Sequence, residues 1–167
     1  MTPEILAWLA EMTRLHIPTP GRVLEVGARD VNGNPRYLFG HAETYTGTDM
    51  EAGDNVDMVV NNHALTETFG AACFDTVLCL ENLEHDSAFW VTIGQLQAVL
   101  KPGGLLVITT PHFGFPEHRY PKHYVNFGQD AYREWFFDGC TVLDLRLLAA
   151  NGRADMTVAG IARKPLL

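Results

Sequence analysis

The chain has few cysteines and no long apolar run. Three cysteines occur in 167 residues, Cys73, Cys79 and Cys140, and no two of them form a C-x-x-C pair. A disulfide framework is therefore not expected, and the pattern fits reduced cysteines in the core. Because no segment has the length of a membrane span or the form of a secretory signal, we expect a soluble cytoplasmic protein with no membrane partner.

Positive charge is also scarce. The chain carries 12 Lys and Arg against 20 Asp and Glu, which gives a formal net charge of −8. No basic run occurs, whereas nucleic-acid backbones and anionic membranes attract clustered Lys and Arg. We therefore expect no nucleic-acid partner.

The length predicts one domain over residues 1–167, with an N-terminal helix and linker over 1–20 and a core over 21–165.

Two common nucleotide-binding motifs are missing. No Gly-Lys-Ser or Gly-Lys-Thr occurs, so a P-loop is excluded. The dinucleotide motif G-x-G-x-x-G fails after Gly27, because Arg29 and Asn32 stand at its second and third glycine positions. An NAD-binding oxidoreductase is therefore a less favoured alternative.

Predicted strands alternate with predicted helices along the chain. Strands are expected at 22–26, 44–49, 55–60, 74–80, 105–110, 141–149 and 156–162. Helices are expected from Thr2 to Pro18, over 35–39, from Ser87 to Leu100 with Trp90, Ile93 and Leu96 on its apolar face, and over 131–137. This order predicts an α/β fold, a Rossmann-like doubly wound and mostly parallel sheet with an antiparallel C-terminal hairpin strand.

One predicted connection is too short for a helix. A helical crossover between parallel strands needs roughly a dozen residues, and only 50–54 separate the second strand from the third. Residues 55–60 therefore form either a short edge strand reached by a tight loop or no strand at all.

The first strand leads into a loop suited to binding a ligand. Asn34 is an expected N-cap and Pro35 a first helical residue, and backbone N–H groups at such a helix start attract anionic groups. Glu25 lies inside the strand, where a carboxylate is costly without a partner. The ammonium group of a ligand beyond the strand end would be such a partner.

Ligands of open α/β sheets bind at the carboxyl ends of the strands. The residues at those ends are 27–30, Asp49 and Met50, 61–63, 81–85, and Pro111 with His112. Four segments carry a resemblance: Val23-Leu-Glu-Val-Gly27, Tyr45-Thr-Gly-Thr-Asp49, Phe74-Asp-Thr-Val-Leu-Cys-Leu80 with Leu83-Glu-His85, and Leu100-Lys-Pro-Gly-Gly-Leu-Leu106. With these segments, the chain resembles the class I S-adenosylmethionine-dependent methyltransferases of the type 11-like small-molecule branch. The resemblance covers residues 20–165.

The resemblance implies S-adenosylmethionine as cofactor and assigns its contacts. Glu25 would hold the amino group of the cofactor, and Gly27 would let the backbone lie close to its methionine part. Asp49 would accept hydrogen bonds from both ribose hydroxyls. Met50 would cover one face of the adenine, and Asn61 would accept a hydrogen bond from the adenine amino group. The remaining cofactor residues are Ala28, Arg29, Asn62, His63, Leu80 and Glu81. The family's glycine loop is altered here, because Arg29 and Val31 replace two of its glycines.

The acceptor site is expected near histidines. His85 follows the fourth strand, and His112 and His118 lie in the aromatic loop 111–128. An imidazole has a pKa near neutrality and can take a hydroxyl proton during methyl transfer. We therefore predict a methyltransferase that acts on a small-molecule acceptor, favouring oxygen, with these three histidines as catalytic candidates. The alternative is a non-catalytic module that only binds S-adenosylmethionine.

The histidine-rich loop also offers possible metal ligands. His112, His118 and His123 with Glu117 offer ligand types that suit zinc, yet their spacing matches no closed structural site. We therefore predict no metal site. The predicted assembly is a monomer or a homodimer.

Overall fold

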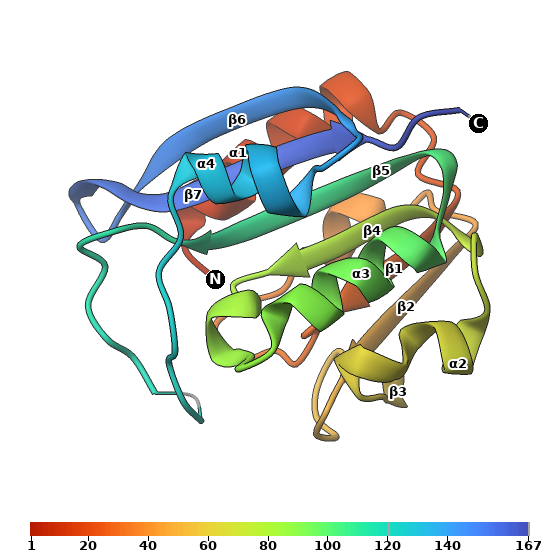
Figure 1. Ribbon diagram of the computed structural model, residues 1–167, viewed down its shortest axis with the longest axis horizontal. Helices are drawn as coiled ribbons and strands as arrows, with labels where there is room; N and C mark the ends of the chain where they lie inside the picture. The colour runs from red at the N-terminus through yellow and green to blue at the C-terminus, as the bar shows by residue number, and fades with distance from the viewer. Residues whose placement is uncertain (120, 167) are drawn as a thin grey trace.

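The structure is a computed structural model that describes residues 1–119 and 121–166. Tyr120, part of the predicted aromatic loop, and Leu167 lie outside the described residues. Among the described residues, seven strands form one sheet in the order β3-β2-β1-β4-β5-β7-β6 (Figure 1). Their bounds are β1 Arg22–Val26, β2 Thr44–Asp49, β3 Met58–Val59, β4 Phe74–Leu80, β5 Leu100–Pro111, β6 Thr141–Ala150 and β7 Arg153–Arg163.

The sheet confirms the predicted fold class. Strands β1 to β5 pair in parallel. Strand β7 runs antiparallel to both of its neighbours, β5 and β6. The closing hairpin therefore adds β7 inside the sheet and leaves β6 at its edge.

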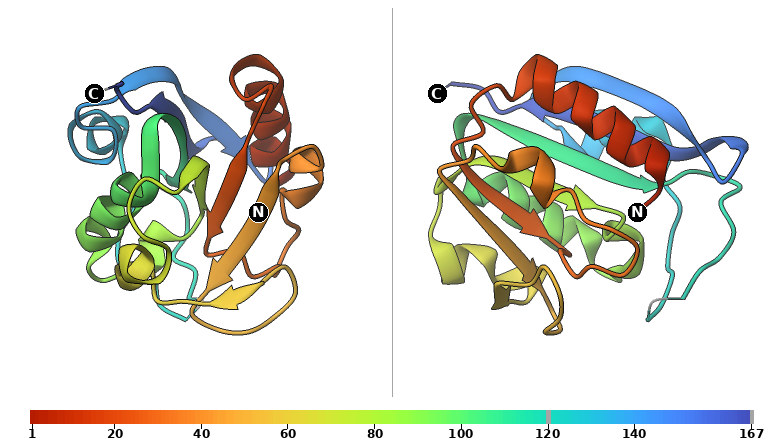
Figure 2. Two further views of the ribbon diagram at one scale, coloured as in Figure 1. Left: turned by 90° about the vertical axis from the view of Figure 1, so that its right-hand side faces the viewer. Right: turned by 180° about the vertical axis from the view of Figure 1, so that it is seen from behind.

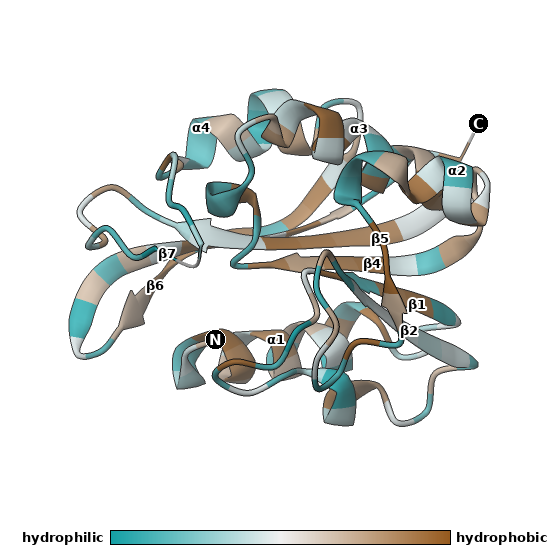
Figure 3. Ribbon diagram, turned by 90° about the horizontal axis from the view of Figure 1, so that it is seen from below, coloured by the Kyte–Doolittle hydropathy of each residue, from teal (hydrophilic) through white to brown (hydrophobic). Residues whose placement is uncertain are grey.

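Helices cover both faces of the sheet. Helix α1 (Pro3–His16) and the 3-10 helix η1 (Arg36–Phe39) lie on one face, whereas α2 (Leu65–Phe69), α3 (Phe89–Val99) and α4 (Gln129–Ala131) lie on the other (Figure 3). Successive residues of a strand point to opposite faces. Val23 accordingly packs in the cluster with α1, while Leu24 and Val26 pack in the cluster with α3. These two apolar layers position the loops at the strand ends.

The short connection after β2 ends in a short edge strand, as one of the two alternatives predicted. Strand β3 is limited to Met58 and Val59, which pair with Thr48 and Asp49. The preceding predicted residues, 55–57, belong to the loop instead. Asn55 has a positive φ of 68°, which turns the chain before the strand can begin.

Several predicted helix boundaries need correction. Residues 101–104 do not end a helix, since β5 begins at Leu100 and its register against β4 shifts there. Trp90 is 63% exposed and does not lie on the apolar face. Phe89 takes that inward place, with its ring centroid 4.9 Å from that of Phe127. The predicted helix 131–137 is α4 followed by a π-helical turn, Tyr132–Phe136.

The predicted helix over 35–39 is the single 3-10 turn η1. The predicted start is wrong by one residue, because η1 begins at Arg36 with Pro35 as its N-cap. The Asn34 Oδ1 still accepts the Arg36 N–H at 3.1 Å. Four residues are too few to build up a helix dipole. The expected anion-binding helix start is therefore not formed, and the loop before η1 is held by its own side chains.

The loop of residues 112–128 follows β5 and projects past the carboxyl ends of the strands (Figure 2). Its backbone is tied back to that edge: the Tyr124 N–H donates to the Glu84 carbonyl at 2.8 Å, and the Phe127 N–H donates to the Pro111 carbonyl at 2.9 Å. Among the residues that the structure describes, no helix has the length and apolar character needed to cross a bilayer.

Candidate functional site

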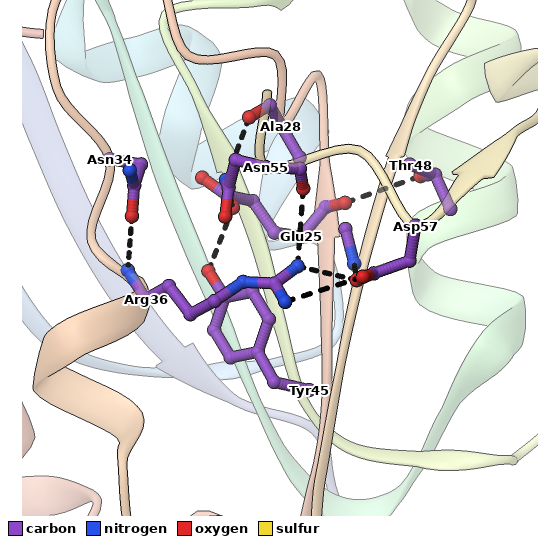
Figure 4. A network of polar contacts seen from close by, with 9 residues as sticks. Glu25, Ala28, Asn34, Arg36, Tyr45, Thr48, Asn55 and Asp57 are labelled. Carbon is purple, nitrogen blue, oxygen red and sulfur yellow. Dashed lines mark hydrogen bonds and ion pairs between the residues drawn. The ribbon is translucent and has the colours of Figure 1, made fainter. Parts of the chain in front are cut away.

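Glu25 is buried near the end of β1 and is held by two donors. Its Oε2 accepts from the Tyr45 hydroxyl and from the Asn55 side-chain amide, both at 2.8 Å (Figure 4). Burial is the largest effect on this group and raises the pKa of Glu25 to about 7. The expected partner for this strand carboxyl is therefore supplied in part by the protein itself.

The loop between β2 and β3 closes over β1 through Asn55. The Asn55 amide also donates to the Ala28 carbonyl at 2.7 Å, and the Asp30 N–H donates to the Asp54 carbonyl at 2.9 Å. Arg36 braces the same loop, because it donates to the Asn55 carbonyl at 3.1 Å and its guanidinium lies over the Tyr45 ring. The loop thus takes the place of a crossover helix.

Gly27 lies where three segments meet. Its φ is +75°, and a Cβ there would lie 2.3 Å from the Asn82 side-chain amide. The Gly27 and Ala28 N–H groups both donate to the Thr48 carbonyl at 2.9 Å. Only glycine combines this backbone conformation with so close an approach. The close neighbour of Gly27 is Asn82 of the same chain, and the role of Gly27 toward the cofactor stays a prediction.

Asp49 stands at the carboxyl end of β2 with its side chain beside the first loop. Its Oδ2 accepts the Arg29 N–H at 3.3 Å and its Oδ1 accepts the Glu51 N–H at 3.0 Å. The Arg29 guanidinium forms an ion pair with Glu51. Met50 is 64% exposed next to them. Arg29, Asp49 and Glu51 are thus in contact at the carboxyl end of β2, and the cofactor contacts assigned to Arg29, Asp49 and Met50 stay predictions.

The three residues after β3 take different orientations. Asn61 caps the 3-10 helix η2 (Asn62–Ala64) through the His63 N–H, at 2.9 Å. Asn62 is buried, and its amide donates to Asn82 Oδ1 at 2.9 Å while its own Oδ1 has no partner among the described residues. His63 Nε2 lies 3.0 Å from the Asp86 carboxylate. The inward-facing asparagine is therefore Asn62 and not Asn61.

Glu81 follows the buried Leu80 at the end of β4 in a strained conformation. Its φ is 51°, and its N–H donates to the Thr109 carbonyl at 2.9 Å. Its buried Oε1 has no partner among the described residues. Burial, with the nearby Glu84, raises the pKa of Glu81 to about 8. A left-handed non-glycine residue at a strand end is the kind of strain found at functional sites.

Glu84, His85 and His118 form a cluster next to Glu81. Glu84 is fully buried, and burial raises its pKa to about 8. His85 Nε2 lies 3.5 Å and His118 Nε2 3.7 Å from Glu84 Oε1. The other ring nitrogen of His85, Nδ1, contacts the Lys122 carbonyl, and burial lowers the pKa of His85. The structure thus brings two of the three predicted catalytic histidines together.

The remaining histidines of the loop have structural partners. His123 Nδ1 accepts the His118 N–H at 3.1 Å, and its Nε2 contacts Asn126 Oδ1 at 2.7 Å. His112 Nδ1 contacts the Asp155 carbonyl of β7 at 3.0 Å, so His112 does not join the cluster. Glu117 pairs with Arg119. The alternative zinc set therefore shares only His118 with the cluster.

Sequence reasoning did not assign four residues that shape this edge: Tyr45, Asn55, Asn82 and Glu84. Tyr45 and Glu84 stand within the motifs quoted above, and their burial could have been read from neighbouring apolar residues. Asn55 and Asn82 carry no such signal, because each acts through a contact with a residue about 25 to 55 positions away in the chain.

The mostly parallel seven-stranded sheet, with acidic groups at the ends of β1 and β2, is the arrangement that the resemblance to S-adenosylmethionine-dependent methyltransferases implies. Residues 2–148 match the family described as methyltransferase domain, and the chain belongs to this family. It is a methyltransferase whose cofactor is S-adenosylmethionine. No curated protein sequence matches the chain.

Solved structures of the same fold cover almost the whole chain. The 1,6-didemethyltoxoflavin-N1-methyltransferase of Burkholderia thailandensis, with 1,6-didemethyltoxoflavin and S-adenosylhomocysteine bound, has a TM-score of 0.74 at 18% identity, over 98% of this chain and 80% of that one. The N-methyltransferase NodS of Bradyrhizobium japonicum, in complex with S-adenosylhomocysteine, has a TM-score of 0.71 at 16% identity, over 98% and 89%.

A third structure contains a partner protein. It is a complex between the Haloferax volcanii Trm112 methyltransferase activator and a putative methyltransferase. It has a TM-score of 0.70 at 15% identity, over 97% of this chain and 89% of that one. At these identities the likeness shows the fold alone.

The residues present fit the cofactor. A buried carboxyl at Glu25 can balance an ammonium group. The unpartnered Oδ1 of Asn62 is a buried acceptor that still needs a donor. Glu25 lies near the carboxyl end of β1 and Asn62 follows β3, two strands away in the sheet, and ligands of open α/β sheets bind at such strand ends.

Proposed function

We propose that the enzyme methylates an oxygen atom of a small-molecule acceptor bound between the ends of β1 and β4 and the loop 112–128. The observation that carries this proposal is the cluster of Glu84, His85 and His118. Glu84 and His85 follow shortly after Asn82, whose side chain packs against Gly27. An imidazole near a hydroxyl can take its proton as the oxygen attacks a methyl carbon.

The cofactor, when bound, supplies an electrophilic methyl group on a sulfonium sulfur. In the proposed site Glu25 balances the cofactor ammonium, Asp49 accepts the ribose hydroxyls, and Gly27, Ala28 and Arg29 form the loop beside them. Asn62 replaces Asn61 as the acceptor that faces the adenine, because only Asn62 points inward with a free oxygen. Met50, His63, Leu80 and Glu81 complete the proposed lining.

Alignment of the reacting atoms supports the reaction as much as proton removal does. Holding two reactants in line and excluding water supplies a large part of the acceleration for a simple displacement. The loop 112–128 supports this role, because its Tyr124 N–H bond to Glu84 places it against the site. His112 stays a weaker catalytic candidate, since its Nδ1 contacts the β7 backbone. A monomer or homodimer stays the predicted assembly.

Calorimetric titration with S-adenosylmethionine and S-adenosylhomocysteine tests the cofactor site. We expect saturable binding of both, no binding of NAD, and a dissociation constant about 10–100-fold higher for Asp49→Ala, since the bonds to two hydroxyls are lost. Asp130→Ala is the matched control, because the Asp130 side chain is 94% exposed in α4. Unchanged affinity in Asp49→Ala would contradict the ribose assignment.

Transfer of a labelled methyl group to a mixed panel of phenols, alcohols and amines tests the acceptor class. Mass spectrometry of the products shows which compounds gain the label, and we expect hydroxyl compounds to gain it. Methylation confined to amines would contradict the oxygen assignment. Cofactor binding with no transfer to any member of the panel would favour the alternative of a non-catalytic binding module.

A further inference from the structure

Glu84 is a buried carboxyl for which the protein provides no hydrogen-bond donor. The residue has no solvent exposure, and among the described residues neither of its side-chain oxygens accepts a hydrogen bond from another residue. Burying an ionised carboxylate that accepts no hydrogen bond lowers the free energy of unfolding by several kcal/mol. The raised pKa of about 8 favours the neutral acid near pH 7, and this neutral group also has no hydrogen-bond partner among the described residues. A bound cation would hold the group ionised and occupy its free oxygen.

The two imidazoles nearest to Glu84 present nitrogen atoms to it at distances beyond ordinary hydrogen bonding. They are His85 Nε2 at 3.5 Å and His118 Nε2 at 3.7 Å from the same oxygen, Oε1. A tetrahedral ion with ligand bonds of about 2.0–2.2 Å holds its ligand atoms about 3.3–3.6 Å apart. The separation of 3.5 Å falls in this range and that of 3.7 Å lies just above it, so a small inward shift of His118 would bring both to the edges of a metal coordination polyhedron.

His85 is oriented as a metal ligand is. Its Nδ1 contacts the Lys122 carbonyl oxygen, which can only accept, so Nδ1 carries the proton and Nε2 carries the lone pair. A backbone carbonyl that fixes one ring nitrogen while the other faces the ion is the usual outer contact of metal-binding histidines. The lone pair of His85 and the oxygen of Glu84 repel each other unless a proton or a cation lies between them.

We propose that Glu84, His85 and His118 bind a divalent transition-metal ion, with zinc as the representative case. Their three ligand atoms lie within 4.8 Å of one another. Two histidines and one carboxylate, with a further position open, are a known ligand set of catalytic zinc and non-haem iron sites. Two ligands come from the end of β4 and one from the loop 112–128, so the ion would also hold the loop against the sheet.

His123 supports the site from outside. Both of its ring nitrogens are engaged, with the His118 N–H and with Asn126, so it places the His118 backbone and offers no ligand atom. The unpartnered Glu81 Oε1 lies on the same segment as Glu84. The open position faces the acceptor region, and this point alone rests on the proposed function: an ion there would lower the pKa of an acceptor hydroxyl. The imidazoles would act as bases, as in the proposed function, only in protein without the ion.

Zinc titration of the full chain tests the site directly. Protein stripped with a chelator and desalted is titrated with Zn²⁺ in competition with a chromophoric indicator. We expect one equivalent to bind and the affinity to fall by at least about 100-fold in Glu84→Gln, His85→Ala and His118→Ala, since each lacks a ligand. His41→Ala, an exposed histidine remote in sequence, should bind as the original chain does. Absent binding, or binding that the three substitutions leave unchanged, would overturn the proposal.

Cobalt absorption and cofactor titration distinguish loss of the metal site from loss of the fold or of the cofactor site. Co²⁺ in the same protein should give the intense visible absorption of a four-coordinate site, and Glu84→Gln should lose it while circular dichroism stays that of the folded protein. A weak six-coordinate spectrum in the original chain would count against the three-ligand site. S-adenosylmethionine titration of the stripped protein is the separate control. Cofactor binding without zinc binding would contradict this proposal alone, and zinc binding without cofactor binding would contradict the proposed function alone.

Discussion

Single residues at the strand ends show how burial sets the chemistry of this site. Glu25 is the clearest case, because desolvation raises its pKa although Tyr45 and Asn55 donate to it. The two hydrogen bonds favour the ionised form, and removal from water disfavours it by more. The residue is therefore poised near neutrality, where an arriving ammonium group would shift it to the charged form.

The raised pKa of Glu25 predicts a pH-dependent stability. A carboxyl with a pKa of about 7 in the folded state and its ordinary value of 4.5 in the unfolded state stabilises the fold fully below pH 4.5. That contribution, about 3 kcal/mol for such a shift, is lost as the pH rises through 7. Urea unfolding at pH 5 and pH 8 should show a smaller loss of stability for Glu25→Gln than for the original chain.

Other groups titrate in the same pH range, so the difference between the two proteins is the informative quantity. Gln keeps an oxygen that can accept from Tyr45 and Asn55 and has no proton to lose. Equal changes in the free energy of unfolding between pH 5 and pH 8 in both proteins would show that Glu25 does not titrate there.

At the scale of elements, the loop between β2 and β3 connects two parallel strands, a connection that a crossover helix usually makes. It reaches back to β1 through Asn55, whose side chain bonds to both Glu25 and Ala28. Asn tolerates the left-handed backbone at φ 68° better than most residues do. One residue thus supplies both the turn and the anchor.

Substitution of Asn55 separates these two roles. Asn55→Ala should lower the free energy of unfolding by about 2–3 kcal/mol, since it loses two hydrogen bonds and forces Ala into a left-handed conformation. Asn55→Gly keeps the backbone freedom and should lose about 1–2 kcal/mol. Asp54→Ala, with an exposed side chain in the same loop, should change little. Urea unfolding checks all three, and equal stability of the Ala and Gly variants would argue against the backbone contribution.

At the scale of the whole molecule, contacts distant in sequence join the two ends of the chain. The Trp8 indole of α1 donates to Asp144 Oδ2 of β6 at 2.8 Å, across 136 positions. Arg146 of β6 pairs with Glu11 of α1 at 3.2 Å. The N-terminal helix therefore covers the C-terminal hairpin and secures the edge of the sheet.

Trp8→Phe tests this connection. Trp8 is only 3% exposed, so the smaller ring leaves unfilled volume and removes the donor to Asp144. We expect a loss of about 2 kcal/mol in the free energy of unfolding. Trp90→Phe, at a residue that is 63% exposed, should stay within about 0.5 kcal/mol of the original chain. Thermal or urea unfolding of both variants gives the comparison, and similar losses would show that the Trp8 contact adds nothing specific.

The sequence by itself determined the mostly parallel character of the sheet and the residues at its strand ends, whereas the order of the strands came from the structure. Apolar strands such as 74–80, with turn and helix signals between them, need little else, because hydrophobic periodicity is a local property. For the same reason the resemblance carried by Glu25, Gly27 and Asp49 led to the family and the cofactor.

Only the tertiary structure decided which side chains meet. Asn62 faces inward where the sequence favoured Asn61, Trp90 faces outward, and His112 lies apart from the other two catalytic candidates. The cluster of Glu84, His85 and His118 joins the end of β4 to a loop more than thirty positions away. Contacts of this kind depend on the path of a loop through space, and loop paths follow from packing against distant residues and not from local pattern.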